Sequence, residues 1–447
     1  MSWIGISCGP SSDQSTSGST EPEVEIEDLA AVPNFTISIE PVNPPAPIPG
    51  FHSFAWARQG NKMLLIGGRT NGFHGLSQRD TVFKSSKANS GIHVIDLDTY
   101  SLSSYDIQWN NPMYLQFSSS NMAFLQDGDT LFLAGGYGRN LAQDIQSNVT
   151  IPRMLSLQVS TMIEKVEQGV NPFKSLMKIA DNTPFVQVSG GELQRNGEYF
   201  YLMFGQNYDG VYVPGKTGKY TGATRVFKFG EHLVYDTSSY SNQVFRRRDI
   251  NVTELHLQSG ANIVAYGGVF TPNDGGYVTP VSMMANNGAF TYAENSLQQI
   301  SNQYTAPLVS VVDQASASNT HVILGGIGES QLVDSSGVWK WEKGDNGAKL
   351  PFVKSITQMS WQNNQLTQKV QMPPNEPQLP ELLGSNAIFF ADQQYIYEGN
   401  SIDLSKVPAG STTIGWFFGG IESQKPTSSM IFPTKVNSTI YAVKLNR

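Results

Sequence analysis

Six short apolar runs, each ending in glycine, recur along the 447-residue chain and constrain its fold more than any other feature. Each run has about four consecutive hydrophobic residues, which is typical of a strand that is buried on both faces. A terminal glycine accepts the positive φ with which the chain leaves such a strand, and it lets a neighbouring backbone approach closely. The runs occupy residues 63–68, 131–136, 201–205, 263–268, 322–326 and 416–420.

Turn signals before these runs divide the repeat units into strands. Pairs typical of hairpin turns stand seven or eight positions before most of the glycines: Gln59-Gly60, Asp127-Gly128, Asn196-Gly197 and Ser259-Gly260. Most units continue with a second pair of extended segments, such as residues 92–97 and 102–109 in the first unit. Four strands in each of six units predict an all-β fold, the six-bladed β-propeller, in which each small sheet packs against its neighbours. The second unit differs, because a capping-box pattern over residues 161–164 predicts a short helix to about Gln168.

The sixth unit contains too few strands to complete a blade by itself. Its extended segments lie near residues 386–391, 413–419 and 439–445. A blade with a missing strand would leave an unpaired sheet edge. The segment 34–40 alternates Phe35, Ile37 and Ile39 with polar residues, as an outer strand should. We therefore expect this N-terminal strand to complete the last blade and close the ring.

The order of an apolar run, Gly-Gly, a hydrophobic-Asp pair and a polar turn resembles the kelch repeat. The closest copy combines His52-Ser53 with Gly67-Gly68 and Ile95-Asp96. Later units are looser, and in the third unit Gln206 stands where the second glycine is expected. The resemblance extends over roughly residues 34–447 and implies a kelch-like propeller. Kelch propellers include scaffolds, lectin-like binders, sialic acid mutarotases and copper oxidases, so the resemblance implies no single function.

Residues 1–33 are predicted to form a leader and flexible tether, and residues 34–447 the propeller. The tether is rich in Ser, Thr, Gly and acidic residues, which bury too little apolar surface to fold. Cys8, after a short apolar segment, resembles the end of a bacterial lipoprotein signal, and it is either a lipid-attachment site or an incidental cysteine. Segments 245–251 and 415–423 resemble those of exported, surface kelch-like proteins of bacteria. We expect an extracytoplasmic protein, secreted or held at the cell surface or outer membrane, with membrane contact only through a lipid anchor.

The composition disfavours several classes of function. The formal net charge is −8, and the only basic run, residues 246–248, is interpreted as a solvated strand end rather than a polyanion site, so no nucleic-acid partner is expected. Six histidines show no metal-binding spacing, and neither a metal nor another cofactor is expected. A copper radical oxidase needs a cysteine crosslinked to tyrosine, whereas the single cysteine, Cys8, precedes the propeller.

The loops that follow the second strand of each unit and those that precede the first strand should emerge on one face. That face is the usual ligand surface of a propeller. Its aromatic side chains can stack on sugars and its arginines can pair with carboxylates, although loops are also polar simply because they face water. We predict that this face binds a glycan or a surface protein. The predicted ligand-binding residues are Arg69, Asn71, Phe73, His74, Tyr137, Arg139, Gln206, Tyr208, Phe270, Glu329 and Glu422, with His52 nearby.

The main hypothesis is therefore a binding or scaffold propeller rather than an enzyme. The alternative is a sugar-modifying enzyme of the sialic acid mutarotase or epimerase class. Such an enzyme needs an arginine that binds the carboxylate, together with an acid/base pair. Arg69 or Arg139 could provide the arginine. Glu329, Glu422 or His74 could provide the acid or base.

Overall fold

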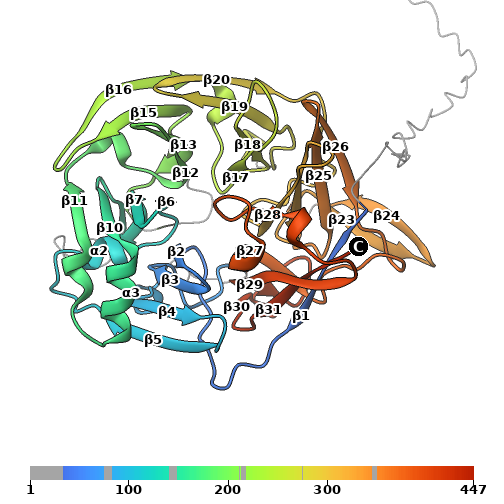
Figure 1. Cartoon of the computed structure of the whole chain (residues 1–447), viewed down its shortest axis with the longest axis horizontal. Helices are drawn as coiled ribbons and strands as arrows, with labels where there is room; N and C mark the ends of the chain where they lie inside the picture. Colours follow the sequence, from blue (N-terminus) through green and yellow to red (C-terminus); the bar gives the residue numbers. More distant parts are fainter. Residues whose placement is uncertain are drawn as a thin grey trace, which may run out of the picture. The chain divides into compact units, whose positions relative to one another are not determined.

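The computed structural model describes residues 34–74, 83–139, 148–210, 212, 218–273, 275–344 and 350–447. The chain divides into the units Met1–Ala31 and Val32–Arg447, and the described residues all belong to the second. In that unit six antiparallel sheets surround a central axis, which confirms the predicted six-bladed β-propeller (Figure 1). The predicted leader and tether, including Cys8, lie outside the described residues.

Each blade consists of four main strands, from the axis outward. The first blade contains β2 (Ala55–Gln59), β3 (Lys62–Ile66), β4 (Gly91–Asp96) and β5 (Ser101–Asp106). The second contains β6 (Ala123–Asp127), β7 (Thr130–Ala134), β10 (Met154–Gln158) and β11 (Leu176–Ala180). The third contains β12 (Ser189–Asn196), β13 (Tyr199–Asn207), β15 (Ala223–Phe229) and β16 (Val234–Ser241).

The other three blades repeat this order. The fourth contains β17 (Asn251–Glu254), β18 (Ile263–Tyr266), β19 (Val281–Asn286) and β20 (Ala289–Glu294). The fifth contains β21 (Leu308–Asp313), β22 (Ser318–Leu324), β25 (Ile356–Gln362) and β26 (Gln365–Val370). The sixth contains β27 (Leu382–Ala391), β29 (Ser411–Ser423), β31 (Tyr441–Asn446) and β1 (Thr36–Pro41).

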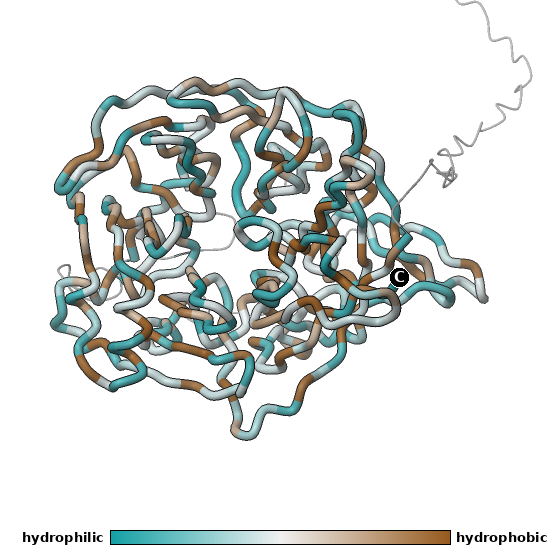
Figure 2. The backbone as a smooth tube through the Cα atoms, in the orientation of Figure 1, coloured by the Kyte–Doolittle hydropathy of each residue, from teal (hydrophilic) through white to brown (hydrophobic). Residues whose placement is uncertain are grey.

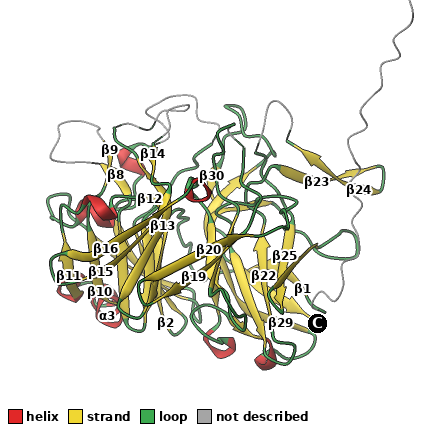
Figure 3. Ribbon diagram, turned by 90° about the horizontal axis from the view of Figure 1, so that it is seen from above, coloured by secondary structure: helices red, strands yellow, loops and turns green. Residues whose placement is uncertain are grey.

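Short elements decorate the two ends of the blades. Additional strands are β8 (Tyr137–Arg139), β9 (Asn148–Thr150), β14 (Lys219–Tyr220), β23 (Ser330–Ser335), β24 (Val338–Lys343), β28 (Ile402–Asp403) and β30 (Lys435–Val436). The α-helices are α2 (Tyr114–Phe117) and α3 (Val159–Glu167). The 3₁₀ turns are η1 (Ser85–Lys87), η2 (Pro172–Ser175), η3 (Pro184–Val186), η4 (Gln243–Phe245), η5 (Gln393–Tyr395) and η6 (Leu404–Lys406). Figure 3 shows β8, β9 and β14 at one end of the blades and α3 toward the other. In the described part of the chain, no helix is long and apolar enough to cross a bilayer.

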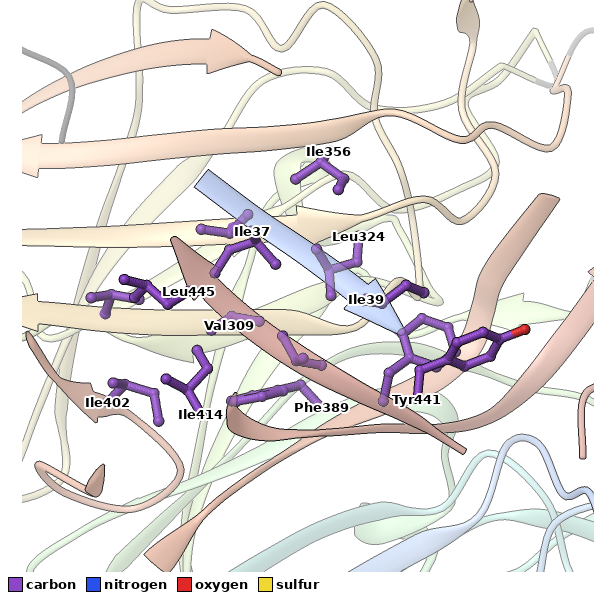
Figure 4. Close-up of a cluster of buried hydrophobic side chains, with 14 of the residues drawn as sticks. Ile37, Ile39, Val309, Leu324, Ile356, Phe389, Ile402, Ile414, Tyr441 and Leu445 are labelled. Atoms are coloured by element: carbon purple, nitrogen blue, oxygen red, sulfur yellow. The ribbon is translucent and has the colours of Figure 1, made fainter. Parts of the chain in front are cut away.

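The predicted closure of the ring is confirmed. Strand β1 pairs antiparallel with β31, so that Ile37 lies opposite Leu445. Ile37 is fully buried, and its backbone N–H and C=O both bond to the side chain of Gln371, at 2.6 and 2.8 Å. Figure 4 shows Ile37 and Ile39 within the hydrophobic cluster that joins the fifth and sixth blades. The N-terminal strand therefore completes the sixth sheet and packs against the fifth.

The hydrophobic core is divided into one cluster for each pair of adjacent blades. Six clusters of buried side chains cover the six interfaces around the ring. Hydrophobic stretches accordingly recur in the blades all round the ring (Figure 2). Because each sheet buries both faces against neighbours, the core grows around the axis rather than outward.

The glycine pairs at the ends of the second strands join each blade to the next. In four of the five Gly-Gly pairs the N–H of the second glycine donates to a carbonyl of the following blade, as Gly68 does to Ser119 at 2.8 Å. The first glycine has a positive φ, and an added Cβ at Gly135 would lie only 1.9 Å from the Val188 carbonyl oxygen. Only glycine fits such an approach without displacing the neighbouring chain.

The third blade shows that our alignment of its glycine was wrong. Gly205 donates to the Arg247 carbonyl, so Gly205 is the second residue of the pair rather than the first. The first position is taken by Phe204, which is buried with φ +62°. Gln206 therefore follows the pair and replaces neither glycine.

The predicted helix exists, but its start was placed wrongly. Helix α3 begins at Val159 instead of Thr161, because Asp129 from the preceding hairpin turn caps it: its Oδ1 accepts the N–H of Ser160 at 2.8 Å. The buried side of α3, including Met162 and Val166, packs into the cluster between the first two blades.

The packing of β1 between the fifth and sixth blades predicts how substitutions in this strand change the free energy of unfolding. Replacing Ile37 with alanine should lower the free energy of unfolding by about 2–5 kcal/mol, because it leaves a cavity between the fifth and sixth blades. Replacing its half-buried neighbour Ser38 with alanine should cost less than about 1 kcal/mol. Chemical denaturation of both variants would measure the difference. Equal losses would show that β1 does not seal the ring.

Candidate functional site

Each blade contributes one residue to a ring around the axis, near the start of the innermost strand in five blades and within β27 in the sixth. This axial ring consists of Ser53, Asn121, Gly190, Asp249, Thr305 and Asn386, all with φ between +49° and +65°. Backbone hydrogen bonds run from blade to blade, from Asn121 N–H to the Ser53 carbonyl at 2.9 Å and from Gly190 N–H to the Asn121 carbonyl at 3.0 Å. Left-handed backbone at non-glycine residues is costly and gathers at functional sites. All six residues line one cavity and all but Gly190 line a second, so the two cavities meet at the axial ring.

The cavity on the predicted ligand face, called here the loop-face cavity, has a volume of about 280 Å³. It is lined by loops that follow second strands and by residues that precede first strands. Seven of the eleven predicted binding residues line it: Arg69, Phe73, His74, Tyr137, Gln206, Tyr208 and Phe270. His52, which was expected nearby, lines it as well. The fold therefore brings residues from four blades together as the loop argument requires.

One wall of this cavity is aromatic. Phe83 lies at the centre of the wall, with its ring centroid 5.3 Å from Phe73, 5.0 Å from Tyr137 and 5.3 Å from Tyr212. Tyr208 extends the wall, 5.3 Å from Tyr212. The Tyr137 hydroxyl donates to the Gly210 carbonyl at 2.6 Å, and burial raises the pKa of this phenol. Interlocked rings of this kind hold one another in place and present a rigid face.

Arg69 places a buried positive charge against this wall. Its residue is only 4 % exposed, and its guanidinium carbon lies 4.6 Å from the Phe83 ring centroid. It donates to the Lys84 carbonyl at 2.8 Å and to Asn71 Oδ1 at 3.3 Å. Burial lowers the pKa of Arg69 to about 10, so the side chain stays charged at neutral pH. Among the described residues, no carboxylate forms an ion pair with it.

A second arginine, Arg248, lines the same cavity beside Asp249 of the axial ring. Its Nη1 lies 3.0 Å from Asp249 Oδ2, and Asn121 Nδ2 donates to the other carboxylate oxygen at 3.4 Å. Burial opposes the charge of Arg248, but Asp249, Tyr212 and Tyr220 outweigh it and raise the pKa of the guanidinium. Burial also raises the pKa of Asp249, although Arg248 counteracts it.

The interpretation of residues 246–248 as a solvated strand end was wrong. Arg247 is 1 % exposed and donates to three backbone carbonyls, and Arg248 faces the cavity. The neighbouring Phe245 and Ile250 are buried as well. These apolar residues on both sides of the run were the signal available in the sequence, because a solvated run would not be expected between buried hydrophobic residues.

His52 is buried and His74 is half-buried, and both are neutral at ordinary pH. Burial lowers the pKa of His52 to about 3 and that of His74 to about 4. His52 Nε2 lies 2.8 Å from the Asn71 carbonyl, so this nitrogen carries the proton and donates it. Neither ring is therefore suited to act as a general acid near neutral pH.

Four predicted residues do not line the loop-face cavity: Asn71, Arg139, Glu329 and Glu422. Asn71 accepts a hydrogen bond from the Arg69 guanidinium through its Oδ1. Arg139 lines an adjacent cavity of about 360 Å³ beside Tyr114 and Trp109. Glu329 accepts the N–H of Gly276 at 2.7 Å. Glu422 pairs with Lys435 at 2.7 Å. Both glutamates proposed for the enzyme alternative are thus engaged elsewhere.

Several lining residues were missed: Phe83, Tyr212, Arg248, Asp249, Tyr304 and the ring residues Ser53, Asn121, Thr305 and Asn386. Most of the missed ring residues directly precede a first strand, a position at which only His52 had been considered. Among the described residues, no group of three or more His, Cys, Asp and Glu side chains could hold a metal ion.

Comparison with known proteins concerns the fold alone. The sequence matches no protein-family model, and no curated protein sequence matches it significantly. Among solved structures, the chain is similar to one titled "Structure of YjhT", with 10 % sequence identity and a TM-score of 0.47, over 88 % of this chain and 98 % of that one. By its own sheets, this chain is a six-bladed β-propeller whose repeats resemble the kelch repeat.

Proposed function

We propose that the protein is a binding propeller whose loop-face cavity takes a glycan that carries a carboxylate. The observation that carries this proposal is Arg69, a buried cation that shares the cavity with an aromatic wall and pairs with no described carboxylate. A buried charge is stable only when it is paired or well hydrogen-bonded. Its two hydrogen bonds to uncharged oxygens leave a carboxylate as the natural partner from a ligand.

The shape of the cavity favours a sugar over a flat protein surface. A space of about 280 Å³ suits one or two sugar rings, close to the lower end of small-molecule sites. Rings such as Phe73 and Tyr212 can stack on the apolar face of a sugar, while Gln206 and Asn386 offer amides to its hydroxyls. A protein partner would instead be expected to cover a wider surface.

We also propose that the protein lies outside the cytoplasm. The resemblances of Cys8 and of segments 245–251 and 415–423 support an extracytoplasmic protein, either secreted or held at a cell surface or outer membrane by a lipid. Glycans with acidic sugars are exposed in that setting, and a tethered propeller could bind them there. A surface protein that carries such a glycan would be an equivalent partner.

Binding to an array of acidic and neutral glycans tests the proposal. Wild-type protein should bind carboxylated glycans, and Arg69→Gln should weaken that binding by at least about tenfold, because a charge-assisted pair is lost. Arg139→Ala is the matched control, since Arg139 lies outside the cavity, and it should bind as wild type does. Melting temperatures would confirm that both variants are folded. Binding that ignores the carboxylate, or an equal loss in both variants, would contradict the proposal.

One observation favours the enzyme alternative. Asp249 lies in the same cavity, beside Arg248, with a pKa that burial raises toward the range useful for proton transfer. Together they could hold a sugar carboxylate and exchange a proton at the ring oxygen or anomeric hydroxyl.

Exchange spectroscopy by NMR would separate binding from catalysis. A binding protein should leave the interconversion of the anomers of its sugar ligand at the rate measured in buffer. A mutarotase would raise that rate, and Asp249→Asn should then return it to the buffer rate while keeping part of the affinity. We expect the buffer rate for wild type, because the only described carboxylate of the cavity is already paired with Arg248.

A further inference from the structure

The second cavity lies on the other side of the axial ring and has different walls. This cavity, called here the strand-face cavity, has a volume of about 590 Å³ and is lined by the innermost strands themselves. Two or three residues after its axial-ring residue, each blade places one half-buried side chain against this cavity. These six side chains form a collar: Trp56, Phe124, Glu192, Val252, Leu308 and Ile388.

Five members of the collar are apolar, and Glu192 is the exception. Among the described residues its carboxyl has no cationic partner, and the one charged group that acts on it is another carboxyl, Asp249. Burial, together with Asp249, raises the pKa of Glu192 to about 8. An isolated carboxylate among apolar side chains is costly, and a nearby cation offsets that cost.

The cations near the collar are already committed. Arg58, at the mouth of the cavity, donates to the Ala391 carbonyl at 2.8 Å and to Asn400 Oδ1 at 3.3 Å, with its guanidinium 4.5 Å from the Phe390 ring centroid. Arg248 is paired with Asp249. Glu254 adds a second carboxyl at the mouth, 3.5 Å from His256. The charged groups that face this cavity therefore leave an excess of negative charge.

Two aromatic rings, from the first and second blades, line the collar together with Glu192. Trp56 and Phe124 contact each other edge to face, with centroids 6.3 Å apart, and both line the cavity. The face of an indole or phenyl ring attracts a cation, and most strongly one that has lost its water. One carboxyl and two such rings in an otherwise apolar collar suit a cation with an apolar surface.

We propose that the strand-face cavity binds an organic ammonium ion, with its charged head between Glu192 and the rings of Trp56 and Phe124 and its apolar part within the collar. This site is separate from the loop-face cavity and does not depend on the glycan proposal. A neutral apolar ligand would leave the carboxyl unpaired, and the collar itself offers a hydrated metal ion a single carboxyl.

Choline and its uncharged isostere 3,3-dimethylbutan-1-ol are suitable probes for calorimetry with the full chain at pH 8. Wild-type protein should bind choline at millimolar or lower concentration and should bind the alcohol at least about tenfold more weakly, because only choline is charged. Glu192→Gln, which keeps the size of the side chain, should reduce choline affinity by at least about tenfold. It should leave the affinity for the alcohol unchanged.

The pH dependence gives a second readout. The cation favours the ionised carboxyl, so affinity should rise about tenfold per pH unit up to the Glu192 pKa of about 8 and level off above it. Glu192→Gln should abolish this rise. The same variant should be more stable than wild type at pH 8 and equally stable at pH 4. Folding raises the pKa of this carboxyl, so the wild-type protein loses stability as pH rises toward 8, whereas the Gln variant does not.

Arg69→Gln serves as the control from the other cavity. It should bind choline as wild type does, and Glu192→Gln should keep any binding of carboxylated glycans, so each proposal fails independently of the other. Equal binding of choline and the alcohol, full affinity in a folded Glu192→Gln variant, or no choline binding by folded wild type at millimolar concentration and pH 8 would overturn the inference.

Discussion

The ring depends on a close approach between the backbones of neighbouring blades. At the first glycine of each of the five Gly-Gly pairs, a carbonyl oxygen of the next blade lies 1.9–2.5 Å from where a Cβ would stand. The second residue of the pair donates its N–H across the interface in the five junctions from Gly68, Gly136, Gly205, Gly326 and Gly420. Each such bond lies beside a separate hydrophobic cluster, so the blades are stabilised pairwise. Strand β1 matters as much as any single junction, because the pairwise stabilisation becomes a closed ring only when the last blade has its outer strand.

The same close approach of neighbouring backbones also positions the residues of the axial ring. The chain segment that accepts the glycine N–H goes on within two or three residues to the axial ring, where its φ is again positive. One junction therefore fixes both the spacing of the blades and the residues that line the channel. The two cavities on either side differ because they are made from different parts of the blades. Long loops give the loop-face cavity its arginines and stacked rings, whereas the alternation of the innermost strands gives the other cavity its collar.

Sequence patterns predicted the architecture well because each strand carries a local signal. The apolar runs, the hairpin glycines and the alternation of Phe35, Ile37 and Ile39 all act over fewer than about ten residues. Phe204 escaped this reasoning, since nothing local shows that a phenylalanine takes a left-handed position. The loop residues were predicted only in part. In blade six, β29 continues through Glu422, which pairs with Lys435 of β30, and in blade five Glu329, just before β23, accepts the N–H of Gly276. The surroundings of Glu192 could not be predicted, because its collar comes from five other blades.

The third and fourth blades break the equivalence of the six units and give the channel its chemistry. Gly190 is the only glycine of the axial ring, and a Cβ there would lie 2.7 Å from Asp249 Oδ1. Its missing side chain leaves room for the Asp249 carboxyl on the axis. From that position Asp249 pairs with Arg248, which lines the loop-face cavity, and adds to the burial that raises the pKa of Glu192 in the strand-face cavity. A ring of six equivalent residues would give each cavity the same polar floor. The floor is instead unequal: the Arg248–Asp249 pair lines the loop-face cavity, whereas the strand-face cavity holds Glu192, which pairs with no described cation.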